Sequence, residues 1–308
     1  MNHLVVRPIV TLGLLVSIMG VLAMPASARP RLKTLDLAQS SQALTAYRKI
    51  QCSTVDSQPV VYHWSGKAYA RIEGEPDRIL FAVEGMNVRQ CVTINDPVKG
   101  PGFRMVSREL MLYLNPKTGE VLKTWTNPWT NKTVDVLHVA NDPVNQRPMF
   151  AKDDAGKPFV FPGRIDGGRV FLPIEVPLFY RNPLAGDYQD QVGGHYHAME
   201  IFDFVMDQAD LINAEKPTTN VSVAWVRIAQ WLPWMEMGSR PGLMVVNATG
   251  QTVAGIEALP PVLKDQIKNN FPIYAAPPPV DDARPNETSW TYYKKIRDSK
   301  QAARPEAK

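Results

Sequence analysis

The sequence predicts a mainly β protein, an antiparallel meander that forms a barrel or a strongly curved sheet with a few peripheral helices. Three observations predict this class. Short apolar segments alternate with a period of two residues, turn residues separate them at close intervals, and helical periodicity is confined to short stretches. A hydrophobic content of 44% supplies enough apolar side chains for a sizeable core.

The first 28 residues are predicted to be a secretory signal peptide. A weakly basic start precedes an apolar run over residues 9–24, and Ala26-Ser27-Ala28 offers the small residues that signal peptidase requires. The run of about 16 residues is shorter than the roughly 20 that span a bilayer. We therefore expect cleavage near Ala28, a mature chain that begins at Arg29 and has no membrane span, and a periplasmic or secreted location.

The first half of the mature chain is predicted to be one helix followed by the meander. Leu44, Tyr47 and Ile50 recur at helical spacing and predict a helix over residues 41–50. Pro116 and Gly119 suit the loop at 115–120, since proline presets one turn residue and glycine accepts positive φ. The predicted strands are 60–64, 68–73, 79–84 leading into 85–91, 105–114, 121–126 and 134–140, with turns at 65–67, 74–77, 115–120 and 130–133.

The second half continues the pattern within the same domain, predicted to span residues 29–298. Residues 195–211 fit neither period, and Pro260-Pro261 opens a helix that extends to about Asn270. Residues 299–308 are charged and small, and are predicted to be a disordered tail. The predicted strands are 159–164, 169–176, 221–230 and 243–247, with turns at 165–168 and 248–251.

Cys52 and Cys91 are the only cysteines of the chain, and an oxidising compartment favours a disulfide between them. Such a bond would close a loop of about 40 residues and stabilise the fold by roughly 4 kcal/mol in the chain-entropy model. Two buried free thiols are the alternative, because sequence alone does not show that the Cβ atoms meet.

The charge balance and the motifs that are missing exclude several classes of function. The net charge is +4, and Lys and Arg form no cluster, which argues against nucleic acid as a partner. The sequence contains no Gly-x-Ser-x-Gly elbow, phosphate loop, dinucleotide fingerprint or cysteine pair for haem. No cofactor and no catalytic residue can therefore be named from motifs.

Four motifs are distinctive: GMNVR at 85–89, SRE at 107–109, WTNPW at 125–129 and WLPWMEMG at 231–238. They resemble a family of exported bacterial proteins called domain of unknown function 1838. The resemblance covers roughly residues 35–293, and its tryptophan-proline motifs are fairly specific to the family. It implies bacterial export and a periplasmic location. It implies no catalytic residue, because no established activity comes with it.

His195 and His197 form the sharpest candidate for a metal site. On a strand the two side chains would point the same way, as paired ligands must, and neutral imidazoles suit zinc, iron or copper. A third ligand could come from Glu200, Asp203 or the distant His138. The spacing matches neither the zinc-protease nor the cupin pattern. Two solvated polar side chains after a glycine turn are the alternative.

Titratable residues of the meander form a second candidate site. Arg108 shares the alternation phase of Leu110 and Leu112, so it would point inward if those leucines line the inside. An inward arginine needs a carboxylate, which the protein or a ligand could supply. The alternative is a bulge that leaves Arg108 solvated. The titratable residues of this group are Glu84, Arg89, Arg108, Glu109, Asp135 and His138.

Tryptophans form the third candidate. Trp125 with Trp129, and Trp231 with Trp234, enclose prolines, which predicts bent segments in place of plain strands. Aromatic side chains beside rigid turns can rim a pocket for an apolar or sugar ligand, and Trp225 adds to the group. Burial in the core is the alternative for any single tryptophan.

These candidates together favour an exported protein that binds a small apolar or aromatic molecule within a barrel-like pocket, contacted by Arg108 and the four paired tryptophans. One alternative is a metal-assisted enzyme that acts on a small molecule through His195 and His197. Another is an envelope protein with a structural or interaction role.

Overall fold

The computed structural model describes residues 33–184 and 194–302, all of which lie in one compact unit that begins at Leu32. The predicted signal peptide and its cleavage site at Ala28 lie outside the described residues, as do residues 303–308. Residues 299–302 were predicted to be part of a disordered tail, but they are helical.

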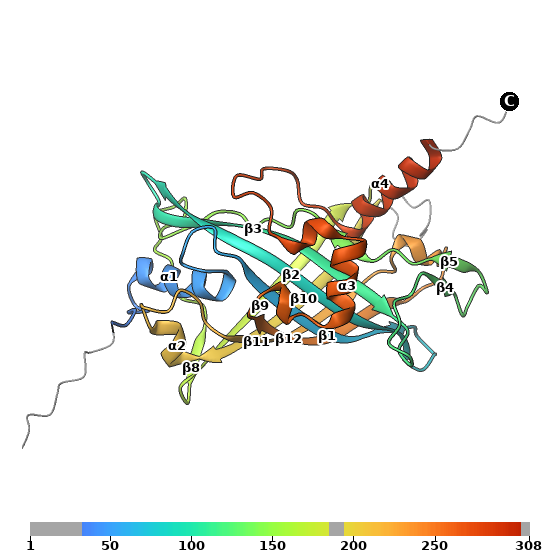
Figure 1. Ribbon diagram of the computed structural model, residues 1–308, viewed down its shortest axis with the longest axis horizontal. Helices are drawn as coiled ribbons and strands as arrows, with labels where there is room; N and C mark the ends of the chain where they lie inside the picture. The colour runs from blue at the N-terminus through green and yellow to red at the C-terminus, as the bar shows by residue number, and fades with distance from the viewer. Residues whose placement is uncertain (1–32, 185–193, 303–308) are drawn as a thin grey trace, which may run out of the picture. The chain divides into compact units, whose positions relative to one another are not determined.

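The protein is mainly β, with 43% strand and 19% helix, as the period-two alternation predicts. The described residues form a large antiparallel sheet of ten strands in the order β6-β3-β2-β1-β12-β11-β10-β9-β8, and β7 also pairs with β3 (Figure 1). A separate small sheet pairs β4 with β5.

The long strands supply most of this sheet, and the short ones lie at its edges and ends. The strands are β1 (Val60–Arg71), β2 (Arg78–Asp96), β3 (Gly100–Leu114), β4 (Thr124–Thr126), β5 (Thr133–Asp135), β6 (Val139–Asn141), β7 (Met149–Phe150), β8 (Arg164–Asp166), β9 (Arg169–Arg181), β10 (His195–Asp207), β11 (Val221–Ala229) and β12 (Leu243–Val253). The helices are α1 (Ser40–Gln51), α2 (Gln208–Ile212), η1 (Pro233–Met235), η2 (Ile256–Ala258), α3 (Pro261–Asn269), η3 (Pro272–Ala275) and α4 (Ser289–Ala302).

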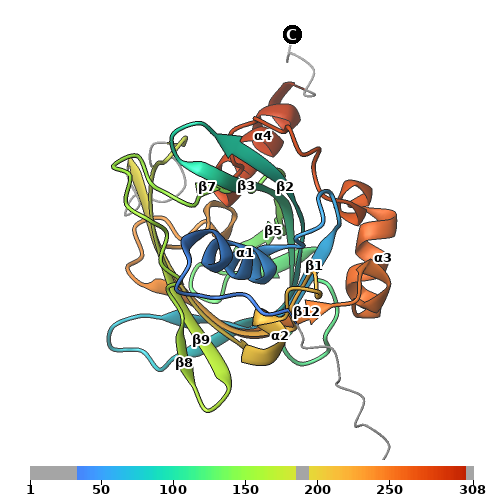
Figure 2. The ribbon, with the colours of Figure 1, turned by 90° about the vertical axis from the view of Figure 1, so that its left-hand side faces the viewer.

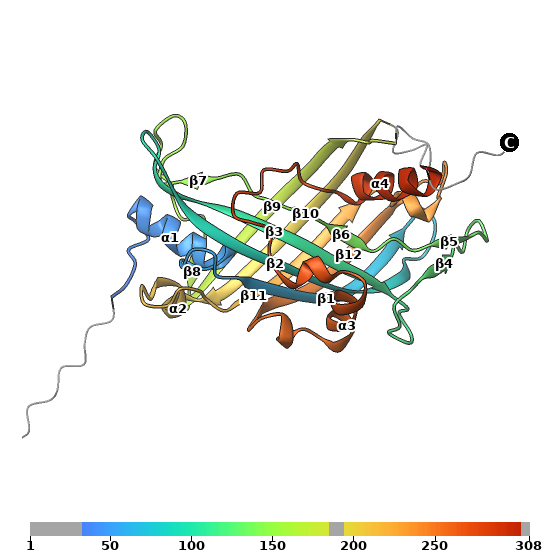
Figure 3. The same cartoon turned by 45° about the horizontal axis from the view of Figure 1, so that its top comes forward.

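The sheet curves around a concave side but does not close into a barrel, so that part of the fold prediction is wrong (Figure 2). Helix α4 and the segment before it cover the opening instead. The backbone N–H of Glu287 donates to Pro143 O beyond β6 (2.9 Å), and Trp290 packs against Tyr196 of β10 with ring centroids 5.5 Å apart. Figure 3 shows α4 beside β6. Contacts of α4 and the segment before it therefore take the place of the strand pairing that would close a barrel.

The predicted turn at 65–67 is also wrong, because β1 runs through it without interruption. Gly66 pairs with Ala248 of β12, where a Cβ atom would collide with the backbone of Asn247. The predicted turn at 248–251 lies inside β12 for the same reason: Gly250 packs closely against Trp64. These glycines permit close packing inside strands and do not mark chain reversals.

Other predictions from periodicity are confirmed in place but not always in length. The helices at 41–50 and near 261–270 correspond to α1 and α3, and Gly119 adopts φ +75° in its predicted loop. Residues 195–211 divide into strand β10 and helix α2, which explains why no single period fits them. The predicted strands at 121–126, 134–140 and 159–164 are largely loops, and only β4, β5, β6 and the start of β8 fall within them.

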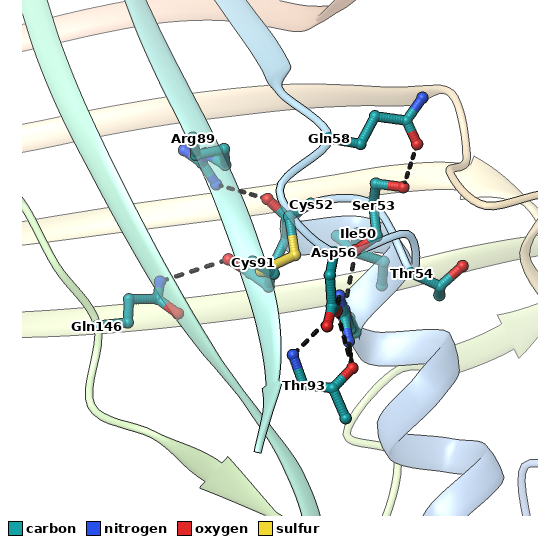
Figure 4. The surroundings of a disulfide bond; sticks show 12 residues. Ile50, Cys52, Ser53, Thr54, Asp56, Gln58, Arg89, Cys91, Thr93 and Gln146 are labelled. Atoms are coloured by element: carbon teal, nitrogen blue, oxygen red, sulfur yellow. Dashed lines mark hydrogen bonds and ion pairs between the residues drawn. A yellow bond between two sulfur atoms is a disulfide. The ribbon is translucent and has the colours of Figure 1, made fainter. Parts of the chain in front are cut away.

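The predicted disulfide between Cys52 and Cys91 is present, with Cα atoms 6.0 Å apart. Cys52 caps the C-terminus of α1, and Cys91 lies on β2, so the bond ties the helix to the sheet (Figure 4). Arg48 of α1 reinforces this junction by pairing with Asp56, whose Oδ1 accepts hydrogen bonds from Thr93 of β2.

The concave side has apolar packing at both ends. At one end α1 packs into a cluster that includes Tyr62, Phe103 and Phe204. At the other end Trp231 and Trp234 pack among the inward side chains of β1, β2 and β3. The convex side of β2 and β3 is covered by α3 and η3. Between the two end clusters lies the candidate site.

Candidate functional site

A cavity of about 460 Å³ lies on the concave side of the sheet. Side chains from β1, β2, β3, β9, β10 and β11 line it, together with the segments around residues 141–146 and 286–289. Strands far apart in the order of the sheet thus face the same space, because the sheet curves around it.

Aromatic side chains form one wall of the cavity. The rings of Trp64 and Trp225 meet edge to face with centroids 5.9 Å apart, and Phe202 stacks on Trp225 at 6.3 Å. Phe204 stacks in turn on Phe202. The indole Nε1 atoms of Trp64 and Trp225 are buried and have no hydrogen-bond partner among the described residues. This wall is apolar, and the two indole N–H groups are enclosed within it.

The same two strands that carry Phe202 and Trp225 also carry an ion pair, two residues further along each strand. Glu200 of β10 and Arg227 of β11 lie directly opposite each other in the strand register, and their side chains are only 19% and 16% exposed. Arg227 donates through Nη1 to Glu200 and through Nη2 to the hydroxyl of Tyr196 at 3.3 Å. The two charges therefore neutralise each other within the lining.

Arg89 of β2 is a cation without a carboxylate partner. Its guanidinium lies 4.6 Å from the ring centroid of Tyr62, its Nε donates to Asn87 Oδ1 at 2.7 Å, and its Nη1 donates weakly to Gln51 O at 3.5 Å. No ion pair joins Arg89 to an acidic side chain within the described ranges. Burial lowers the pKa of Arg89, but the group remains a cation at neutral pH.

Glu109 of β3 faces the same cavity and lies opposite Asn87. Its carboxyl accepts no hydrogen bond and forms no ion pair with any described residue, although a filled core would avoid such a group. Burial raises the pKa of Glu109 to about 7, and the negative charge of Glu200 adds to that effect, while Arg227 and Arg89 oppose it. Near neutral pH the carboxyl therefore exchanges between its neutral and ionised forms.

The strands around this cavity match a known family. A family model described as protein of unknown function (DUF1838) matches residues 57–297. The chain belongs to the DUF1838 family. The match extends from just before β1 into α4, so it contains every segment that lines the cavity. No curated protein matches the chain.

Arg108 does not line the cavity of this DUF1838 chain. Its Nε donates to Asp142 Oδ1 at 2.7 Å and its Nη1 to the carbonyls of Ile273 and Ala276, on the convex side. Leu110, in the same phase as Arg108, packs there beneath α3. Ser107 and Glu109, in the other phase of β3, face the cavity instead. Both faces of β3 are buried, so burial alone does not show which face is the inner one.

The paired tryptophans lie beside the cavity and not in its lining. The ring centroids of Trp125 and Trp234 are 6.1 Å apart, and those of Trp129 and Trp231 are 5.9 Å apart. Trp231 and Trp234 are buried, with 2% and 3% exposure. The four rings form the apolar cluster that closes one end of the concave side, while Trp225 is the predicted tryptophan that reaches the cavity.

His195 and His197 share one face of β10, as predicted, and are exposed on the convex side. Glu200 points to the opposite face and pairs with Arg227, and His138 accepts a hydrogen bond from the backbone of Tyr113. Among residues 33–184 and 194–302, no group of three or more His, Cys, Asp and Glu side chains could hold a metal ion. The structure does not bring the predicted ligands together.

Sequence reasoning placed Arg89 and Glu109 in one group of titratable residues but assigned Glu200 to the metal candidate. It missed Trp64, Asn87 and Tyr180 altogether. A usable signal was present: Asn87 and Arg89 share one phase of β2, and Ser107 and Glu109 share one phase of β3. Successive side chains of a strand point to opposite faces. A strand that lies between a cavity and a covering helix therefore has polar residues at alternate positions that face the cavity, and apolar residues at the positions that face the helix.

One structural feature bears on the location of the protein. The disulfide is compatible with an oxidising compartment outside the cytoplasm. No helix in the described part of the chain is long and apolar enough to cross a membrane.

Proposed function

We propose that this DUF1838 protein is exported and binds a small apolar or aromatic molecule in the central cavity. The observation that carries the proposal is the composition of that cavity: an aromatic wall faces a small set of polar groups in a space of about 460 Å³. Pockets for small molecules usually have this form, with an apolar lining, a few placed polar groups, and volumes of about 300–1,000 Å³.

Unused hydrogen-bonding capacity supports the proposal. The buried atoms Trp64 Nε1, Trp225 Nε1 and Asn141 Oδ1 have no partner among the described residues, and all three residues line the cavity. A buried polar group without a partner costs about 1–3 kcal/mol, which stability alone would not favour. A ligand that pairs with one of these enclosed groups after a small shift of the side chains around it would offset that cost.

The competing functions receive less support. A metal-assisted enzyme would use His195 and His197, which lie on the solvent-facing side of β10, away from the cavity lining. A purely structural envelope protein would not need an unpaired carboxyl such as Glu109 between two well-packed clusters. Binding without a catalytic step is the function that the geometry supports best.

A cavity-filling substitution tests the binding proposal. Val176→Trp on β9 would place an indole in the cavity, whereas Val226→Trp would add the same group on the convex side of β11. We expect small organic molecules extracted from the purified wild-type protein, identified by mass spectrometry, to be absent from Val176→Trp and present in Val226→Trp. Thermal melts should show both variants folded. A wild-type protein that carries no small molecule and shows no tryptophan quenching by a broad apolar library would contradict the proposal.

Export is tested separately. Intact mass of protein purified from a bacterial envelope should match a chain that begins at Arg29. A mature pool that retains Met1 would show that the leader is not removed.

A further inference from the structure

The charged side chains of the cavity do not all balance in pairs. Glu200 pairs with Arg227, and Glu287 accepts a hydrogen bond from Lys295 at 2.9 Å. Arg89 remains as a cation that no described carboxylate contacts. A half-buried, unpaired charge of this kind is costly in a region of low dielectric, so its environment favours an added anion.

Glu109 does not serve as that anion by direct contact. Its partner across the strands is Asn87, and Arg89 is its diagonal neighbour, where Cβ atoms lie about 7–8 Å apart. The two groups face the same space without forming an ion pair. A carboxylate placed between them would receive hydrogen bonds from the guanidinium of Arg89 and, when Glu109 is neutral, from its carboxylic O–H.

We infer that the ligand of this cavity is a monocarboxylic acid with an apolar or aromatic body, whose carboxylate binds between Arg89 and the protonated carboxyl of Glu109. The inference rests on the proposed function and names the ligand class. A single uncompensated cation matches one negative charge, and not the two of a phosphate monoester. The aromatic wall of Trp64, Phe202 and Trp225 matches an apolar body. An organic cation would be repelled by Arg89.

Binding of a carboxylic acid by the wild-type protein should depend on pH. Below pH 7 Glu109 is mostly neutral and can donate to the ligand, while above pH 7 its charge repels the ligand carboxylate. Affinity for an acid should therefore fall about tenfold from pH 6 to pH 8, and affinity for the matching amide should not change. The titratable and charged groups that face Glu109 are Arg89 of β2, Tyr113 of β3, Glu200 of β10 and Arg227 of β11.

The test uses matched probes on the mature protein. Affinities for 2-naphthylacetate, 2-naphthylacetamide, decanoate and 1-decanol are measured by calorimetry and by tryptophan quenching between pH 5.5 and pH 8.5. At pH 6 we expect each acid to bind at least tenfold more tightly than its neutral counterpart. That preference should shrink about tenfold by pH 8.

Variants assign the preference to residues. Arg89→Gln should bind acid and amide equally, Arg89→Lys should keep most of the preference, and Arg169→Gln, an exposed control, should match the wild type. Glu109→Gln should keep the preference but lose its dependence on pH, and the exposed control Glu175→Gln should keep both. If Arg89→Gln does not fold, the wild-type and Glu109→Gln pH profiles decide.

The outcomes separate the two proposals. Neutral probes that bind the cavity as tightly as acids at pH 6 would overturn the ligand class and leave small-molecule binding intact. A preference for acids that does not depend on pH, or that survives Arg89→Gln, would also overturn it. No binding by any probe or by the broad apolar library would remove both proposals.

Discussion

Strand β3 and strand β9 are both long, both antiparallel and both line the cavity, yet their burial differs. On β3 both faces are buried: Leu110 and Leu112 pack under α3, while Met111 and Tyr113 pack on the concave side. On β9 one face is buried and the other is exposed to solvent, as its alternating pattern shows. The alternate positions that carry apolar residues therefore identify the concave side of β9, but they do not identify the concave side of β3.

The difference explains why Arg108 lies on the other side of the sheet from the cavity. The rule that apolar residues point inward holds for a strand with one solvent face. On β3, where α3 covers the second face, the more apolar set of alternate residues packs against the helix. The set that contains polar residues faces the cavity. Glu109 and Arg108, adjacent in sequence, thus serve a cavity and a surface network respectively.

The contrast predicts unequal effects of truncation on the two convex faces. Leu110→Ala removes a fully buried side chain beneath α3 and should lower the free energy of unfolding by about 2–5 kcal/mol. Phe179→Ala on β9 removes a ring that is 70% exposed and should change it by no more than about 0.5 kcal/mol. Urea unfolding of both variants measures the difference, and similar losses would refute the contrast.

The disulfide sharpens the same comparison, because it ties α1 to the β2 side of the sheet only. Its loop has a sequence separation of 39, so replacing both cysteines with alanine should cost at most about 4 kcal/mol. Unfolding in urea with and without reductant should reproduce that loss in the wild type alone. Non-reducing peptide mapping that finds two alkylated thiols would contradict the bond.

Glu109 should make stability depend on pH. Its pKa rises from about 4.5 to about 7 on folding, so the stability present below pH 4.5 declines as pH rises toward 7, by at most about 3 kcal/mol. Burial also lowers the pKa of His138 to about 4, so acid destabilises the fold through that group. The measurement is therefore the difference in the free energy of unfolding between the wild type and Glu109→Gln at each pH. A difference that does not vary between pH 4.5 and pH 7 would argue against the buried carboxyl.

The smallest effect is expected on the convex face of β10. His195→Ala with His197→Ala removes exposed side chains, whose described ring contact is that of His197 with Phe179. Stability should change by no more than about 0.5 kcal/mol, and elemental analysis should find the same metal content in the variant and the wild type. Loss of a stoichiometric metal would restore the predicted metal site.

Much of the local structure could be predicted because its causes are local. Helical spacing of Leu44, Tyr47 and Ile50 predicts α1, and the Pro260-Pro261 pair marks the start of α3. Prediction failed where a distant contact decides the outcome. In the sequence Gly66 resembles a turn residue, but in the structure β12 packs closely against it. The residues of α4 carry no strong apolar stripe, and the packing of Trp290 against Tyr196 holds this helix in place.

The sequence by itself determined the β class, helices α1 and α3, and the family, and it favoured the disulfide that the structure contains. Alternation, capping and cysteine count depend on residues close in the chain or few in number. Only the tertiary structure decided which face of β2 and β3 encloses the cavity and that a helix, not a strand, covers the opening. Those outcomes depend on where α3 and α4 pack, and both helices lie far along the chain from the strands that they cover.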